Sequence, residues 1–158
     1  MKHTNYSTWQ LWSMVIIRVA IGWHFLYEGI TKLLNPDWSS LGYLMDSKGL
    51  FEGLFHSIAG NAAMLNVMDF LNVWGLILIG AGLVVGLFTR IATIAGIVLL
   101  AFYYFSHPAI IGVNYAIPSE GSYLWINKNL IELLTLWVIM LFPTWKIVGL
   151  DRYIFNKK

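Results

Sequence analysis

The sequence predicts an all-α integral membrane protein: a bundle of four transmembrane helices with a short interfacial helix in the first outer loop. Of the 158 residues, 58% are hydrophobic and 11% are charged, whereas about 25% are charged in an ordinary soluble domain. Residues 70–89 contain no charge at all, and about 20 apolar residues suffice to cross a bilayer core. Lipid is therefore expected to cover much of the chain.

Residues 1–158 are expected to form one membrane domain, with spans that follow the apolar runs. Pro36 stops the first helix, since proline cannot continue a helical hydrogen-bond ladder. The run over residues 70–106 is too long for one straight span, so a tight turn is predicted at residues 86–90, where glycine permits the backbone. The predicted spans are residues 9–34, 69–87, 90–107 and 125–147.

The two longer connections are predicted to lie on the same side of the membrane. Residues 50–58 carry apolar side chains at helical spacing, which predicts a short interfacial or re-entrant helix. Residues 108–124 form the second ordered loop. Basic residues near span ends are retained in the cytoplasm, which predicts cytoplasmic N- and C-termini. Those basic residues are Lys2, Arg90, Lys146, Arg152, Lys157 and Lys158.

Several classes of function are excluded by composition. The chain has no cysteine, so disulfides, dithiol redox pairs, Cys-ligated zinc and iron-sulfur clusters are ruled out. Its ten basic residues are scattered, so nucleic acid is not an expected partner. No phosphate loop or dinucleotide fingerprint occurs. His3 and His56 show no metal-ligand spacing, and no metal is predicted.

Charged residues inside the predicted spans are the main functional signal, because each costs about 2.5 to 3.5 kcal/mol at the bilayer centre if unpaired. Two acid–base pairs have helical i,i+4 spacing, Glu28 with Lys32 and Lys128 with Glu132. Arg18 lies within an arc of about 80° that also contains Glu28 and Lys32. A buried charged cluster near the outer leaflet is therefore predicted.

Antiparallel spans would bring other polar residues to the same depth as these pairs. Asp69 and Asn72 begin the second span, His107 ends the third, and Asn129 begins the fourth. Two interpretations remain open. The cluster either holds the helices in register, as buried ionic networks can, or lines a cavity that receives a polar headgroup or transfers protons.

His24 and His107 raise the question of haem, because two helices can each supply an axial histidine. Their predicted depths differ, so haem is not favoured. The second span carries the small-residue pattern Gly82-x-x-x-Gly86, preceded by Gly75 and Gly80. Small residues let helices approach closely, which indicates packing of the two hairpin helices and, secondarily, a homodimer through the second helix.

Three blocks of this sequence resemble the DoxX family of small four-helix membrane proteins. They are Arg18-x-x-x-Gly22-x-x-Phe25-x-x-x-Gly29-x-x-Lys32; Asn72-Val-Trp-Gly75 with Gly80-x-Gly82-x-x-x-Gly86-x-x-Thr89-Arg90; and Asn127-Lys-Asn129-Leu-Ile-Glu132. The resemblance implies a multi-pass protein of the bacterial inner membrane. DoxD-like members form the membrane subunit of thiosulfate:quinone oxidoreductase, and other members are associated with membrane complexes in oxidative-stress and thiol defence.

The resemblance implies redox chemistry at the membrane, with quinone as the acceptor and a partner subunit or a directly reacting substrate as the electron source. On this hypothesis Glu28 and Glu132 are the catalytic proton carriers, because buried carboxylates with shifted pKa values suit that task. Neighbouring polar residues would bind the quinone carbonyl or an anion such as thiosulfate. These are Arg18, His24, Lys32, Asn72, Lys128 and Asn129.

A second hypothesis is a non-enzymatic scaffold or carrier that binds a lipid or a partner protein through its outer loops and charged cavity. It needs no electron route, so whether the chain is an enzyme stays open. Transport is less favoured, because a single four-helix unit lacks the inverted repeats usual in transporters.

Overall fold

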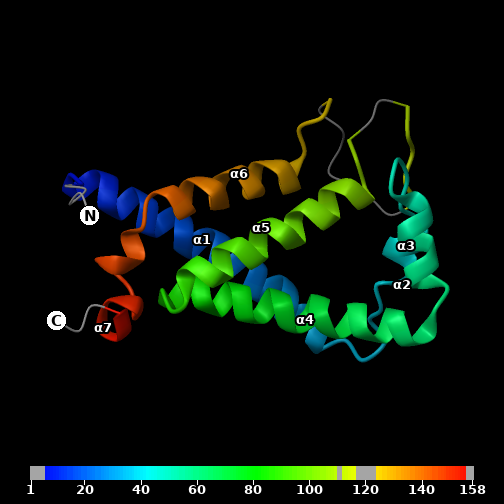
Figure 1. The fold of residues 1–158 in the computed structure, drawn as a ribbon, viewed down its shortest axis with the longest axis horizontal. Coiled ribbons are helices and arrows are strands. Elements are labelled where there is room, and N and C mark those ends of the chain that lie inside the picture. The colour runs from blue at the N-terminus through cyan, green and yellow to red at the C-terminus, as the bar shows by residue number, and fades with distance from the viewer. Residues whose placement is uncertain (1–5, 110–111, 117–123, 156–158) are drawn as a thin grey trace.

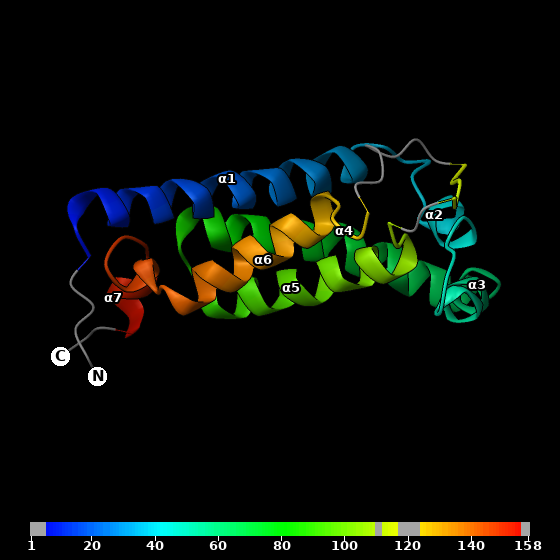
Figure 2. The same ribbon diagram turned by 90° about the horizontal axis from the view of Figure 1, so that it is seen from above.

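A computed structural model of the chain describes residues 6–109, 112–116 and 124–155. Every regular element within these residues is a helix, and the four longest run side by side along the bundle (Figures 1 and 2). They are α1 (Thr8–Leu33), α4 (Ala62–Val85), α5 (Thr89–Ser106) and α6 (Lys128–Leu141). One end carries α2 (Leu41–Met45) and α3 (Glu52–Ala59); the other carries η1 (Thr144–Lys146) and α7 (Asp151–Phe155).

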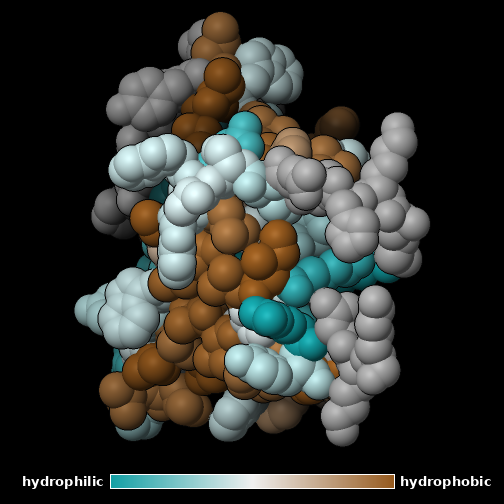
Figure 3. Space-filling view, turned by 90° about the vertical axis from the view of Figure 1, so that its left-hand side faces the viewer, coloured by the Kyte–Doolittle hydropathy of each residue, from teal (hydrophilic) through white to brown (hydrophobic). Residues whose placement is uncertain are grey.

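Three helices in the described part of the chain are long and apolar enough to cross a membrane, namely α1, α4 and α5. Only 28 to 33% of the most apolar window of each is buried, so the other residues of these windows are exposed or only partly buried. Even the end of the bundle that carries the α4–α5 turn is largely hydrophobic, with small hydrophilic groups between apolar areas (Figure 3). The chain is accordingly a membrane protein.

Two helices have bounds that differ from those of the spans predicted for them. The second helix begins at Ala62 rather than near residue 69, because the Asn61 carboxamide oxygen accepts from the backbone N–H groups of Ala63 and Met64 and caps the helix there. The helix expected over residues 125–147 covers only 14 residues. It ends at Leu141 because Pro143 cannot continue it, and it is not among the three candidate spans.

The predicted hairpin turn is confirmed. Gly86 ends α4 in the left-handed conformation with φ 71°, and Phe88 precedes α5 at φ 48°. A tight reversal with two left-handed residues lets α5 return directly along α4. The predicted helix over residues 50–58 corresponds to α3, which packs with α2 around a small separate core of Leu44, Phe55 and Ala59.

The bundle core is formed where α1, α4, α5 and α6 meet. Its fully buried members include Phe25, Leu83 and Leu136, which are at most 1% exposed. The predicted packing of the two hairpin helices is confirmed at Gly82, where a Cβ would lie 3.1 Å from the Ala92 Cβ atom of α5. Gly80 makes a further contact. A Cβ on Gly80 would lie 2.4 Å from the backbone nitrogen of Leu26 on α1, so Gly80 brings α4 against α1. The homodimer predicted through the second helix stays a prediction.

Candidate functional site

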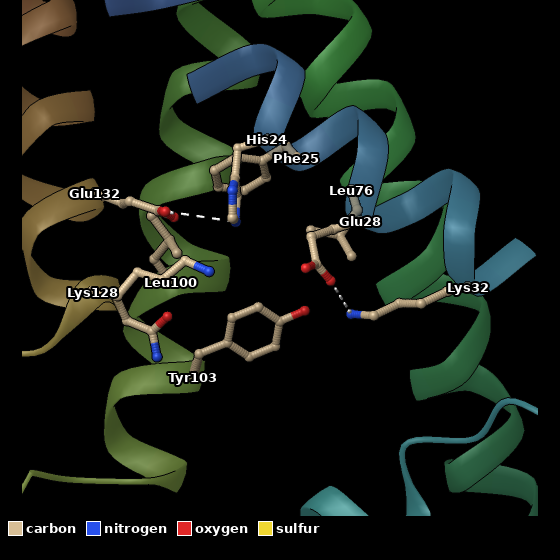
Figure 4. Close-up of a pocket in the computed structure, with 10 residues that line it drawn as sticks. His24, Phe25, Glu28, Lys32, Leu76, Leu100, Tyr103, Lys128 and Glu132 are labelled. Carbon is tan, nitrogen blue, oxygen red and sulfur yellow. Dashed lines mark ion pairs between the residues drawn. The ribbon is translucent and has the colours of Figure 1, made fainter. Parts of the chain in front are cut away.

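A pocket of about 140 Å³ lies between α1, α5 and α6, with one residue of α4 at its back (Figure 4). It combines apolar side chains with charged groups from facing helices. The residues that line it are His24, Phe25, Glu28, Lys32, Leu76, Leu100, Tyr103, Lys128, Asn129 and Glu132. Six of the eight sequence-predicted site residues are therefore brought together.

Two side-chain pairs, each of a carboxylate and a basic group, lie on opposite sides of the pocket. The His24 Nε2 atom of α1 lies 3.6 Å from the Glu132 Oε1 atom of α6. One helical turn further along α1, the Glu28 carboxylate lies 3.9 Å from the Lys32 ammonium. The Glu28 side chain is 44% exposed and that of Glu132 is 16% exposed. Two carboxylates of different accessibility thus face one cavity.

Lys32 is held by several partners as well as by Glu28. Its Nζ atom donates to the Asn72 Oδ1 atom at 3.1 Å. It also lies 5.1 Å from the ring centroid of Trp38 and 5.8 Å from that of Tyr103, within the range of cation–π attraction. The ammonium is therefore fixed at one edge of the pocket.

The α6 wall follows from how that helix begins. The Asn127 side chain accepts from the backbone N–H of Leu130 at 3.0 Å and caps the helix. Lys128 and Asn129 consequently occupy its first turn, with Glu132 one turn further on. The Lys128 side chain extends into the pocket near Glu132 (Figure 4).

Asn72 and Asp69 of α4, expected at the same level, have different surroundings. Asn72 reaches the site indirectly, through Lys32 and the Tyr103 hydroxyl. The Asp69 carboxylate instead accepts hydrogen bonds from the Ser39 hydroxyl at 2.8 Å and from the Ser40 backbone N–H at 2.8 Å. It therefore anchors the segment between α1 and α2 and does not line the pocket.

The expectation that Arg18 belongs to the same cluster was wrong. Ten residues separate it from Glu28, which is about 15 Å along a helix. Arg18 is 2% exposed, and its Nη1 atom donates to the Val148 carbonyl oxygen at 2.9 Å. Its charge is complemented there by Asp151 of α7.

This end of the bundle is a structural junction, which we call the Arg18–Asp151 junction. The Asp151 carboxylate accepts from the backbone N–H groups of Phe88 and Thr89, at 2.7 and 2.9 Å, and so caps α5. The Asp151 backbone N–H donates to the Gly86 carbonyl oxygen at 2.8 Å. The segment after α6 therefore joins the hairpin turn to α1.

His107 belongs to a separate group at the opposite end. Its ring stacks on Tyr43 at 4.0 Å, and its Nε2 atom lies 3.8 Å from the Asp46 Oδ2 atom. Burial lowers the pKa of His107; Asp46 opposes that shift, and Lys48 adds to it. His24 and His107 do not face one another across a shared site. Among the described residues, no group of three or more His, Asp or Glu side chains could hold a metal ion.

Tyr103 lines the pocket but was not among the site residues predicted from the sequence. It lies in an aromatic run whose side chains must point several ways, so the run alone does not distinguish it. The buried residues Gly96 and Leu100, seven and three positions earlier, could have placed it on the inward face of α5.

The sequence model of the DoxX family matches residues 13–109, which is more than half of the chain. The chain belongs to the DoxX family. No curated protein and no solved structure matches it. The family match runs from α1 to just beyond α5, so it includes the α1 and α5 walls of the pocket of this DoxX protein. The α6 wall of the pocket comes after the matched segment, as do Val148 and Asp151 of the Arg18–Asp151 junction.

Proposed function

We propose that this DoxX protein is the membrane subunit of a quinone-linked redox complex, and that its pocket receives the quinone headgroup. The observation that carries the proposal is a cavity of ring size with acid–base groups on facing walls. At about 140 Å³, it resembles in volume the protein cavities of about 150 Å³ that bind benzene. Phe25, Leu76 and Leu100 supply the apolar surface that a ring requires.

Reduction of a quinone to a quinol takes up two electrons and two protons, one proton at each carbonyl oxygen. Glu132, paired with His24, is suited to deliver a proton on the α6 side. Glu28 is suited to do so on the α1 side, where its greater exposure allows it to be reprotonated from outside. The chain has no cysteine, so the electrons are proposed to come from a partner redox subunit that oxidises thiosulfate or a thiol.

The same proposal sets the protein in a bacterial inner membrane, with both termini cytoplasmic and α6 as a fourth, short span. Its support is the charge distribution. Arg90, Lys146 and Arg152 lie near the end of the bundle that carries the hairpin turn, where basic residues mark the cytoplasmic side. Asp46 and Glu52 belong to the opposite end. Lys2, Lys157, Lys158 and the acidic Glu120 lie outside the described residues.

The test compares Glu28→Gln and Glu132→Gln with Glu52→Gln, an exposed control on α3. Positioned acid–base groups contribute about 10²- to 10⁴-fold to a rate, so each pocket variant should slow quinone reduction by native membranes at least about a hundredfold. Glu52→Gln should not. Extraction and mass analysis of the purified protein should find bound quinone in all three.

A folded wild-type protein that binds no quinone would contradict the proposal and favour the scaffold or carrier function. Loss of folding in both pocket variants would assign the two carboxylates to helix packing instead.

A further inference from the structure

The orientation of the Asn72 carboxamide is determined by its neighbour Lys32. An ammonium group can only donate hydrogen bonds, so the atom that faces the Lys32 Nζ at 3.1 Å must be the amide oxygen. The amide nitrogen then faces the Tyr103 hydroxyl at 2.6 Å. Because an amide nitrogen only donates, the Tyr103 oxygen is the acceptor in this contact.

The Tyr103 hydroxyl consequently keeps its own hydrogen for another partner. No residue in the described part of the chain accepts a hydrogen bond from it. In Figure 4 the hydroxyl points across the pocket toward Glu28 and Lys32. The Tyr103 ring is held in place by an edge-on contact with Tyr43 at 5.8 Å between centroids. The donor is therefore oriented before any ligand binds.

Other tyrosines of the same end of the bundle differ from Tyr103. The hydroxyl groups of Tyr43, Tyr104 and Tyr115 each donate to a backbone carbonyl oxygen, of Tyr103, Trp125 and Pro108 respectively. Their hydrogens are used within the protein. Tyr103 accepts from a side chain and presents its hydrogen to the cavity.

We propose that Tyr103 donates a hydrogen bond to a carbonyl oxygen of the pocket ligand, with Asn72 and Lys32 acting through it as positioning residues. This rests on the proposed function and refines it. The ligand must carry an acceptor oxygen on its α5 side, while its opposite edge faces His24 and Glu132. An alkyl chain or a purely cationic headgroup would leave the Tyr103 hydroxyl without a partner.

The probe for this proposal is a short-chain ubiquinone isotopically labelled at both carbonyls. Its infrared carbonyl bands are recorded when it is bound to the purified protein in detergent. A hydrogen bond weakens a carbonyl bond, so one band should lie at lower frequency than the other in the wild type. Tyr103→Phe should shift that lower band to higher frequency and raise the Kd about tenfold, as expected for one net hydrogen bond. Tyr104→Phe, the matched control, should change neither.

Asn72→Leu separates positioning from structure. This variant keeps the Tyr103 hydroxyl but removes the group that orients it, so the lower-frequency carbonyl band should broaden. Its Kd should be intermediate between those of the wild type and Tyr103→Phe. An unchanged band in Tyr103→Phe would overturn the assignment of Tyr103 while leaving the quinone site intact. An unchanged band in Asn72→Leu would overturn the positioning role. Absence of binding by the folded wild type would overturn this inference together with the proposed function.

Discussion

The two sides of α1 contact their neighbours in opposite ways. Against α4, the helix backbones touch: a Cβ on Gly22 would lie 2.8 Å from the Leu83 Cβ atom, and one on Gly80 even closer to Leu26. Against α6, α1 presents His24 and Glu28, and a cavity separates the helices. The smallest residues stand where backbones meet, and the charged ones where space remains for a ligand.

This difference separates stability from function along one helix. The α1–α4 contact leaves no room for a side chain, so it should be sensitive to added volume. The α1–α6 side contains the His24–Glu132 contact and the Glu28–Lys32 ion pair, both partly exposed, and exposed pairs of this kind contribute little to folding. Substitutions on the first side should unfold the protein, and those on the second should change its chemistry.

The largest effect on stability is expected at the Arg18–Asp151 junction. This junction joins α1 to the turn between α4 and α5, and so belongs to the structural side of α1. Asp151→Ala removes two hydrogen bonds to the start of α5 and the counter-charge of the buried Arg18. The free energy of unfolding should fall by about 3 to 5 kcal/mol. Denaturant unfolding in detergent measures it. Exposed Asp37→Ala, the control, should change it by no more than about 0.5 kcal/mol.

A smaller effect is expected within α4 itself. Gly80→Ala adds a Cβ 2.4 Å from the Leu26 backbone nitrogen, and overpacking of this kind costs about 1 to 3 kcal/mol. Gly75→Ala is the matched control, since its Cβ would meet nothing within 4 Å. It should be neutral or stabilising by up to about 1 kcal/mol through helix propensity. Equal melting temperatures for the two variants would refute the close α1–α4 contact.

The smallest effect is expected from pH, through His107 at the far end of the bundle. Its folded-state pKa lies below the ordinary value of 6.5 because the ring is buried, so the unfolded chain takes up the proton first. The contribution of neutral His107 to the free energy of unfolding should be fully present above about pH 6.5. It should decrease as the pH drops toward the folded pKa, by less than about 1.4 kcal/mol per pH unit. His107→Phe, which can keep the stacking on Tyr43, should flatten this dependence in thermal melts. Identical pH profiles would assign the loss to other groups.

The membrane character and the hairpin were predictable because they depend on local properties, namely long charge-free runs and a glycine between them. The pocket was largely predictable for a similar reason. Glu28 with Lys32 and Lys128 with Glu132 are local pairs, and antiparallel helices bring the end of one to the start of another.

What could not be predicted depends on contacts between distant segments. Arg18 shares a helical face with Glu28, but the face alone does not show that Val148 and Asp151 lie beside it. The early start of α4 was missed because Asp69 resembled a span boundary, whereas Ser39 and Ser40 satisfy its carboxylate. The hydrogen-bonding role of Tyr103 depends on Asn72 and Lys32, which lie on other helices.

The Arg18–Asp151 junction also constrains the order in which the protein is made. Arg18 is translated 130 residues before its hydrogen-bond acceptor Val148, and Thr89 is translated 62 residues before Asp151. Since membrane helices are inserted as they emerge, α1, α4 and α5 would be in the bilayer while the guanidinium and the first N–H groups of α5 await their partners. These groups reach the partners that they have in the complete fold only when the segment after α6 docks.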